Sequence, residues 1–318
     1  MSNADHKDID HRILEYATKV GLTTLDELQY VEVKLFKAFT FLPDIAMHFG
    51  TFNIKKNFIR KTATSSIKDS IGFLFYNIFD DDGTSSGTST IKLPGDAPFV
   101  RIFPFTIQQK INFTKNTQAT YVSISISADY LKSFLKEESP YFQFLFDDTN
   151  SFLIEELMTD DILRTVNDIV KKEAPDTMKS YYYKIKAMEL LFYLFESLRK
   201  RESSVHQKLS GKEIKSIYQV RDKIVSSLSQ PTSIAELKQI AGMNELKLRR
   251  IFTQVFGMGI YDYYQHLRMK EAARLLRDEK LSVSEAGYQM GFENLSHFSR
   301  VFEKHMGQKP KKYSNNLK

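Results

Sequence analysis

Cationic and polar side chains cluster in two short segments near the C-terminus of this 318-residue chain. Arginine and lysine bind phosphate groups and the edge of guanine, and serine hydroxyls bind a wider range of partners. The two sets are Lys247, Arg249 and Arg250, and then Ser296, His297 and Arg300. Both segments carry groups suited to a polyanion, provided that regular elements hold them in place.

The two segments lie in two copies of an internal repeat. In both copies a serine precedes a glycine by nine residues, and a phenylalanine precedes a second glycine by five residues. The landmarks are Ser233, Glu236, Gly242, Phe252 and Gly257, matched in order by Ser282, Glu285, Gly291, Phe302 and Gly307. The tail therefore contains one small unit twice.

Each landmark predicts a local structure. The serine and the glutamate three residues later have the spacing of a capping box at a helix start. Three such pairs occur: Ser210 with Glu213, Ser233 with Glu236, and Ser282 with Glu285. Gly242 and Gly291 stand where a helix of about eight residues must end, a position that favours positive φ. Asn244 and Asn294 then cap the next helices, so the tail contains two helix-turn-helix units.

A helical segment from about Gly259 to Asp278 joins the two units. Its roughly 20 residues span about 30 Å at 1.5 Å each. One turn of DNA is about 34 Å long, so a rigid connector could place the second helix of each unit in successive major grooves. The alternative is a helical protein-interaction module, in which the repeated helices only pack against each other.

The distribution of charge favours DNA over that alternative. The whole chain carries a formal charge of +6, but residues from Ser204 onward hold 20 basic and 11 acidic side chains. That tail has a net charge of +9, and the rest of the chain has −3. A basic region confined to one end is typical of a nucleic-acid module joined to a second domain. We therefore expect double-stranded DNA as the partner.

The tail from Met243 to Tyr313 resembles the AraC/XylS family of bacterial transcription regulators. The matching elements are Leu248-Arg-Arg-Ile-Phe252, Gly257, Tyr264 through Arg268, Ala272-Ala-Arg-Leu-Leu276, Ser282-Val-Ser-Glu285, Gly291-Phe292, His297-Phe-Ser-Arg-Val-Phe302 and Gly307-Gln-Lys-Pro310. The resemblance implies base contacts from Leu246, Arg249 and Arg250 in the first unit, and from Leu295, Ser296, His297 and Arg300 in the second. It also implies RNA polymerase as a partner, and phosphate groups at the helix starts near Ser233 and Ser282.

Three positions depart from the family pattern. Lys238 stands where a small alanine is usual, Ala286-Gly287 replaces Ile-Ala, and Ser314 replaces an arginine. Glycine lowers helix propensity by up to about 1 kcal/mol relative to alanine. Gly287 therefore suggests a softer second unit.

The N-terminal half follows a different pattern. Short apolar bursts and alternation from Asp26 to Ser127 predict strands, with a flexible loop at Asp80 to Thr90. Helical spacing begins near Ala128 and is clearest from Asp176 to Lys200. We predict an α+β chain: a cupin-like β-barrel or sheet with helices, then an all-α domain with two helix-turn-helix units. The predicted boundaries are 1–202 for an effector-binding or dimerisation domain, 203–211 for a linker and 212–318 for the DNA-binding domain.

The role of the first domain stays open between effector sensing, dimerisation and contact with another protein. The resemblance implies a cupin-type barrel followed by helices that dimerise, which makes the stripe Ile185, Phe192 and Phe195 a candidate homodimer interface. The dense aromatic residues between Phe36 and Phe146 could line an apolar pocket for a small-molecule effector.

A cupin-like enzyme is the competing class. Metal cupins need two or three histidines and a carboxylate around one ion, but residues 1–200 hold only His6, His11 and His48. No Gly-x-Ser-x-Gly elbow, phosphate loop or dinucleotide fingerprint occurs. We therefore predict no enzyme, with no catalytic residues, metal or cofactor.

The composition also bears on the compartment. The chain has no cysteine, which suits a reducing environment. Its N-terminus is acidic rather than signal-like, and no apolar run of about 18 residues occurs. We expect a cytoplasmic protein with no membrane partner.

Overall fold

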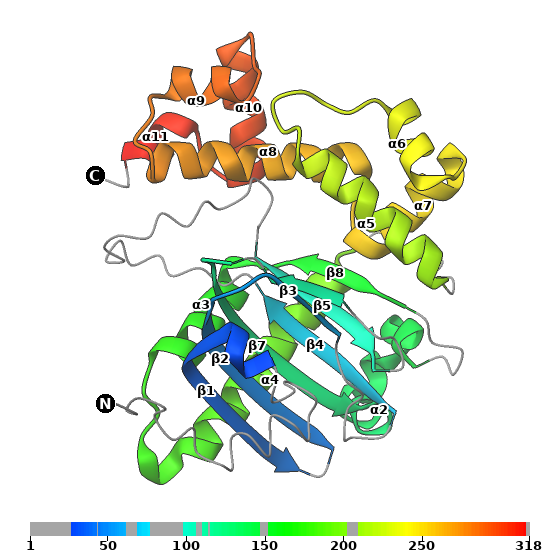
Figure 1. Cartoon of the computed structure of the whole chain (residues 1–318), viewed down its shortest axis with the longest axis vertical. Helices are drawn as coiled ribbons and strands as arrows, with labels where there is room; N and C mark the ends of the chain where they lie inside the picture. Colours follow the sequence, from blue (N-terminus) through cyan, green and yellow to red (C-terminus); the bar gives the residue numbers. More distant parts are fainter. Residues whose placement is uncertain are drawn as a thin grey trace, which may run out of the picture. The chain divides into compact units, whose positions relative to one another are not determined.

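The computed structural model describes residues 27–42, 44–61, 69–76, 98–105, 110–113, 115–146, 152–201 and 209–315. Contacts between residues divide them into two compact parts, which we call the sheet unit (27–201) and the helical unit (209–315) (Figure 1). The predicted loop at 80–90, His6, His11 and most of the predicted linker lie outside the described residues. None of the described helices is long and apolar enough to cross a membrane.

The sheet unit is built on antiparallel strands. Six of them form one sheet in the order β1-β2-β7-β4-β5-β8, and β3 pairs with β6 (Figure 1). The strands are β1 (Val31–Leu42), β2 (Ile45–Ile54), β3 (Phe58–Lys61), β4 (Ser70–Tyr76), β5 (Phe99–Pro104), β6 (Lys110–Phe113), β7 (Gln118–Ser127) and β8 (Ile154–Leu157). The helices are α2 (Ala128–Leu135), α3 (Asp160–Lys171) and α4 (Lys179–Arg199), with 3₁₀ segments Glu27–Tyr30, Lys136–Leu145 and Asp176–Met178. The α+β prediction is confirmed, with strands before Ala128 as expected. β8 is a strand that the sequence pattern missed.

One face of the sheet forms the core of this unit. Val122, Ile124 and Ile126 of β7 are at most 1% exposed and belong to the same buried cluster as the inner residues of α4. Phe195 of α4 also belongs to this cluster, where its ring contacts Phe73 and Phe142. The predicted partner-facing stripe is therefore wrong at Phe195, because Phe73 and Phe142 pack against its ring and bury it in the core of this unit.

Residues on the second face of the sheet are also buried. The alternate residues Ser123 and Ser125 of β7 are each 7% exposed, and His48 of β2 is 6% exposed. The imidazole of His48 lies edge-on to the ring of Tyr121, with the ring centroids 5.6 Å apart. Small and polar side chains are therefore buried on the face of the sheet that points away from α4.

The helical unit contains seven helices in the described residues. They are α5 (Gly211–Val225), α6 (Ile234–Ala241), α7 (Glu245–Phe256), α8 (Ile260–Arg277), α9 (Val283–Gln289), α10 (Leu295–Met306) and α11 (Pro310–Asn315). Figure 1 shows α5 to α7 grouped at one end of α8 and α9 to α11 at the other. This arrangement is the predicted pair of helix-turn-helix units joined by a connector helix.

The connector α8 belongs to both halves of the helical unit. Its first half supplies Tyr263 and Leu267 to the core formed by α5, α6 and α7. Its second half supplies Met269 and Leu275 to the core formed with α9 and α10. Because each half of one continuous helix is buried in a different core, the two helix-turn-helix units cannot separate without exposing apolar surface.

A histidine pair also joins α8 to the second unit. The rings of His266 on α8 and His305 on α10 lie 6.0 Å apart. Nε2 of His266 is buried and has no hydrogen-bond partner among the described residues. Burial, with smaller contributions from Lys270 and His305, lowers the pKa of His266 to about 4. His266 is therefore neutral in the folded protein near neutral pH.

We predict that this histidine makes the helical unit sensitive to mild acid. The unfolded chain binds a proton on His266 below pH 6.5 and the folded chain does not, so stability is lost as the pH falls from about 6.5 toward 4. Between pH 7.5 and 5 the loss is about 2 kcal/mol in the free energy of unfolding. Urea denaturation followed by circular dichroism measures it. His266→Gln should lose less stability than the wild type over the same range, and an equal loss would contradict the prediction.

Candidate DNA-binding surface

The second helix of each repeat starts at an asparagine cap. Oδ1 of Asn244 accepts a hydrogen bond from the backbone N–H of Lys247, and Oδ1 of Asn294 accepts one from His297, both at 2.9 Å. Ahead of each cap, a glycine with positive φ (62° at Gly242) makes the turn. The start of each second helix is therefore fixed by local hydrogen bonds, as the sequence predicts.

The three predicted capping boxes do not all form. Those at Ser210 and Ser282 are complete, because each serine and its glutamate cap each other. At Ser233 the hydroxyl accepts from the N–H of Glu236, but the carboxylate of Glu236 pairs with Lys223 of α5 at 2.8 Å. An ion pair to a neighbouring helix replaces half of this capping box.

The start of α7 presents Leu246, Arg249 and Arg250 to solvent. Leu246 is 81% exposed and does not contribute to the core. Arg249 pairs with Glu245 one turn earlier at 2.8 Å. No ion pair in the described part of the chain includes Arg250. Arg250 is therefore the cation of this helix most available to a partner.

Lys247 forms an ion pair within the helical unit. Its Nζ lies 2.7 Å from Oε1 of Glu213, whose side chain is 18% exposed. The Lys247 ammonium and the Ser210 cap together lower the pKa of Glu213 to about 2. Lys247 therefore links α7 to the start of α5.

The start of α10 differs from that of α7. Ser296, His297 and Arg300 are exposed, and Arg300 stands six residues after its asparagine cap, as Arg250 does. No ion pair between described residues includes Arg300. Leu295 is half-buried. The two surfaces therefore share the arginine but differ in their apolar side chain.

Gly287 of α9 explains why Leu295 is less exposed than Leu246. A Cβ at this position would lie 2.8 Å from Cδ2 of Leu295 and 3.1 Å from Cδ1 of Phe298. The glycine therefore lets α10 pack closely against α9, with Leu295 over the contact. From the sequence we expected Gly287 to soften the second unit. The structure shows that Gly287 also allows α9 and α10 to pack closely.

A buried arginine on the connector fixes the second unit in place. Nε of Arg268 donates a hydrogen bond to the carbonyl oxygen of Met290, at 2.7 Å, and the residue is 7% exposed. Its guanidinium lies 3.8 Å from the centroid of the Phe292 ring and 5.4 Å from that of Tyr264. In the described part of the chain no carboxylate forms an ion pair with Arg268. The two aromatic rings and the carbonyl oxygen stabilise its positive charge instead.

The same junction reaches the first unit. The hydroxyl of Tyr264 donates a hydrogen bond to the carbonyl oxygen of Leu228, in the turn after α5, at 3.1 Å. A Cβ added to Gly291, in the turn of the second unit, would overlap the carbonyl oxygen of Ser229. The turn of the second unit therefore packs directly on the backbone that follows α5, beside Arg268. We call these contacts the α8 junction.

A family described as "Helix-turn-helix domain" matches residues 237–316, which span most of this arrangement. Residues 237–316 are an AraC-type helix-turn-helix domain. The resemblance seen in the sequence is confirmed for this domain.

Two relatives carry names of regulators. The chain is 32% identical over 91 residues to the "HTH-type transcriptional regulator GlxA" of Rhizobium meliloti, covering 29% of this chain and 28% of the relative. It is 34% identical over 99 residues to the "Regulatory protein PchR" of Pseudomonas aeruginosa, covering 31% of this chain and 33% of the relative. The similarity thus spans about a third of the length of each of these two relatives. Their names agree with the prediction of a regulator rather than an enzyme.

A solved structure of a transcriptional regulator with an AraC-type DNA-binding domain, from Chromobacterium violaceum, is also similar to part of the chain. The sequence identity is 22% and the TM-score is 0.32. The similarity covers 34% of this chain and 96% of that chain.

The α8 junction is the part of the AraC-type domain that reasoning from single residues missed. Part of this junction could be inferred from the sequence. Tyr264 and Arg268 lie four residues apart and therefore on one face of a predicted helix. An arginine facing an apolar stripe indicates a buried partner. Nothing local identified that partner as the carbonyl oxygen of Met290.

We predict that Gly291 at this junction is much less replaceable than Gly307, the glycine that ends α10. Gly291→Ala and Gly307→Ala both force an alanine to φ near 74°, at about 1 kcal/mol each. Only Gly291→Ala also drives a Cβ into the Ser229 backbone, so it should lose about 2–4 kcal/mol of stability in total. Urea denaturation of the two variants measures the difference, and equal losses would show that the contact with Ser229 is absent.

Proposed function

We propose that the chain is a transcription regulator that binds one face of duplex DNA through two recognition helices, α7 and α10, in successive major grooves. The observation that carries the proposal is the equivalent position of Arg250 and Arg300, each exposed and six residues after its asparagine cap. Both helices are held by one connector. A domain that served only to pack helices would not need two such matched, unpaired cations.

The length of the connector supports this arrangement. α8 has 18 residues and spans about 27 Å. With α7 packed at one end and α10 at the other, the two recognition helices can match the rise of about 34 Å between successive major grooves. The proposed base contacts are Leu246, Arg249, Arg250, Ser296, His297 and Arg300.

We assign a smaller role in DNA binding to two of the predicted contacts, Lys247 and Leu295. Lys247 would have to leave Glu213 to reach DNA, and that exchange would cost the ion pair. Leu295 lies against Gly287, so only its exposed edge is available. We therefore assign most of the base recognition to the two arginines and their exposed neighbours.

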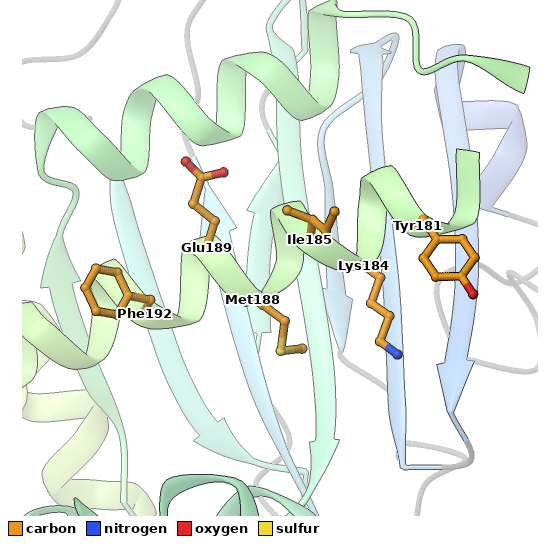
Figure 2. A pocket seen from close by; sticks show the side chains of 6 residues that line it. All are labelled: Tyr181, Lys184, Ile185, Met188, Glu189 and Phe192. Atoms are coloured by element: carbon orange, nitrogen blue, oxygen red, sulfur yellow. The ribbon is translucent and has the colours of Figure 1, made fainter. Parts of the chain in front are cut away.

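We further propose that the sheet unit controls the DNA-binding unit. In this proposal the aromatic residues between Phe36 and Phe146 line an apolar pocket for a small-molecule effector. The outer face of α4, where Tyr181, Ile185 and Phe192 are exposed and line a shallow groove, suits a second copy of the chain (Figure 2). We also propose that the chain acts in the cytoplasm and contacts RNA polymerase, by analogy with regulators of the same domain type.

A site-selection experiment with the full chain tests the DNA-binding proposal. Duplexes selected from a random library should contain two half-sites about 10 base pairs apart. Arg250→Ala should relax the preference in one half-site, and Arg300→Ala in the other, by about 1–3 kcal/mol or roughly 5- to 150-fold. Arg164→Ala, on α3 of the sheet unit, removes the same charge and serves as the control.

The outcomes separate recognition from general attraction to phosphates. If either arginine variant loses the same affinity for selected and random DNA, that arginine contacts a phosphate and does not read a base. If the wild type binds no duplex more tightly at low salt than at physiological salt, the domain is a protein-interaction module and the proposal fails.

A further inference from the structure

A lysine of the proposed recognition helix α7 is paired with a carboxylate of another helix. Nζ of Lys247 lies 2.7 Å from Oε1 of Glu213 on α5, and the two side chains are 41% and 18% exposed. Arg249 pairs with Glu245 of its own helix, and no ion pair among the described residues includes Arg250. The contact between Lys247 and Glu213, which we call the α5–α7 pair, therefore lets a second helix act on the charge of α7.

The carboxylate is the fixed partner of the α5–α7 pair. Its Oε2 accepts hydrogen bonds from the backbone N–H and the hydroxyl of Ser210, each at 2.7 Å, which leaves Oε1 for Lys247. These contacts lower the pKa of Glu213 to about 2, so it stays negatively charged near neutral pH. Lys247 carries its ammonium on a flexible four-carbon side chain and is partly exposed. A second anion can therefore approach the lysine but has to compete with Glu213.

The α5–α7 pair is a minor part of what holds the two helices together. Ile217 of α5 and Leu248 and Phe252 of α7 are fully buried in a shared apolar core. An ion pair between partly exposed groups stabilises a fold much less than the burial of one such side chain. Its effect on charge is complete by comparison, because a phosphate at the start of α7 meets a neutral pair in place of a cation. The pair is therefore placed to affect anion binding more than stability.

We propose that Glu213 is a positioning residue that holds Lys247 away from DNA phosphates and so limits the affinity of α7. This inference rests on the proposed DNA-binding function, and it adds a residue outside the recognition helices that sets how strongly the first unit binds. Each cation that contacts a phosphate releases counterions, so the number of such contacts is measured by the salt dependence of the affinity. In the wild type Lys247 makes no phosphate contact. Without the carboxylate it makes one.

Four forms of the full chain test the proposal on a selected duplex: the wild type, Glu213→Gln, Lys247→Met and the double variant. Glutamine keeps an oxygen that can cap Ser210 but carries no charge. Glu213→Gln should bind about three- to tenfold more tightly at low salt, and its slope of log affinity against log salt should steepen by about one. Damage to the fold would lower the affinity, so it cannot account for such a gain.

The lysine variant distinguishes the α5–α7 pair from the general effect of removing a negative charge. Lys247→Met should leave the salt slope unchanged in the wild type and should reduce it by about one in the Glu213→Gln background. The double variant should therefore return to the wild-type slope. Glu196→Gln on α4, which opens an ion pair with Lys200, changes the net charge equally and should leave the slope unchanged.

Two results would overturn the proposal. One is a slope that falls by about one when Lys247→Met is made in the wild type, because the lysine would then already contact a phosphate. The other is a folded Glu213→Gln variant whose affinity and slope equal those of the wild type. If Glu213→Gln does not fold, the slope of Lys247→Met alone decides. Wild-type binding is measured in the same titrations, so a chain that binds no duplex refutes the proposed function itself.

Discussion

The hydrogen bond from buried Arg268 to the carbonyl oxygen of Met290 is the contact on which the geometry of the AraC-type domain depends. Arg268 lies near the middle of α8, where the helix passes from one apolar core to the other. Its guanidinium contacts the rings of Phe292 and Tyr264, and Gly291 brings the turn of the second unit onto the Ser229 backbone. The spacing of α7 and α10 is therefore a property of a packed junction and not of a flexible linker.

The two helix-turn-helix units are copies in sequence but not in their interactions. In the first unit, Lys247 is committed to Glu213, and Leu246 is free to contact a partner. In the second, Gly287 draws α10 close and partly covers Leu295. The exposed Arg250 of the first unit has its equivalent in Arg300. If the domain binds DNA as we propose, its site should accordingly have two unequal halves.

Local signals made the helical unit predictable from sequence. Asn244 and Gly242 fix the helix ends through hydrogen bonds and φ angles that depend only on neighbouring residues. The contacts that set the spacing were not predictable, because Arg268 and Met290 are 22 residues apart in the chain and no local pattern connects them. The same limit applies to α4, whose apolar residues lie on both sides of the helix. Only packing against the sheet distinguishes buried Phe195 from the exposed face.

The two halves of α8 hold α7 and α10 at one fixed spacing. The direct measurement is the affinity of the full chain for a selected duplex and for the same duplex with about 5 or 10 base pairs inserted between its half-sites. A rigid domain should lose the second half-site in both cases, so the affinity should fall to that of a single half-site and should not recover at the full-turn insertion. Recovery at about 10 base pairs would mean that the connector extends, which would contradict a fixed spacing of α7 and α10.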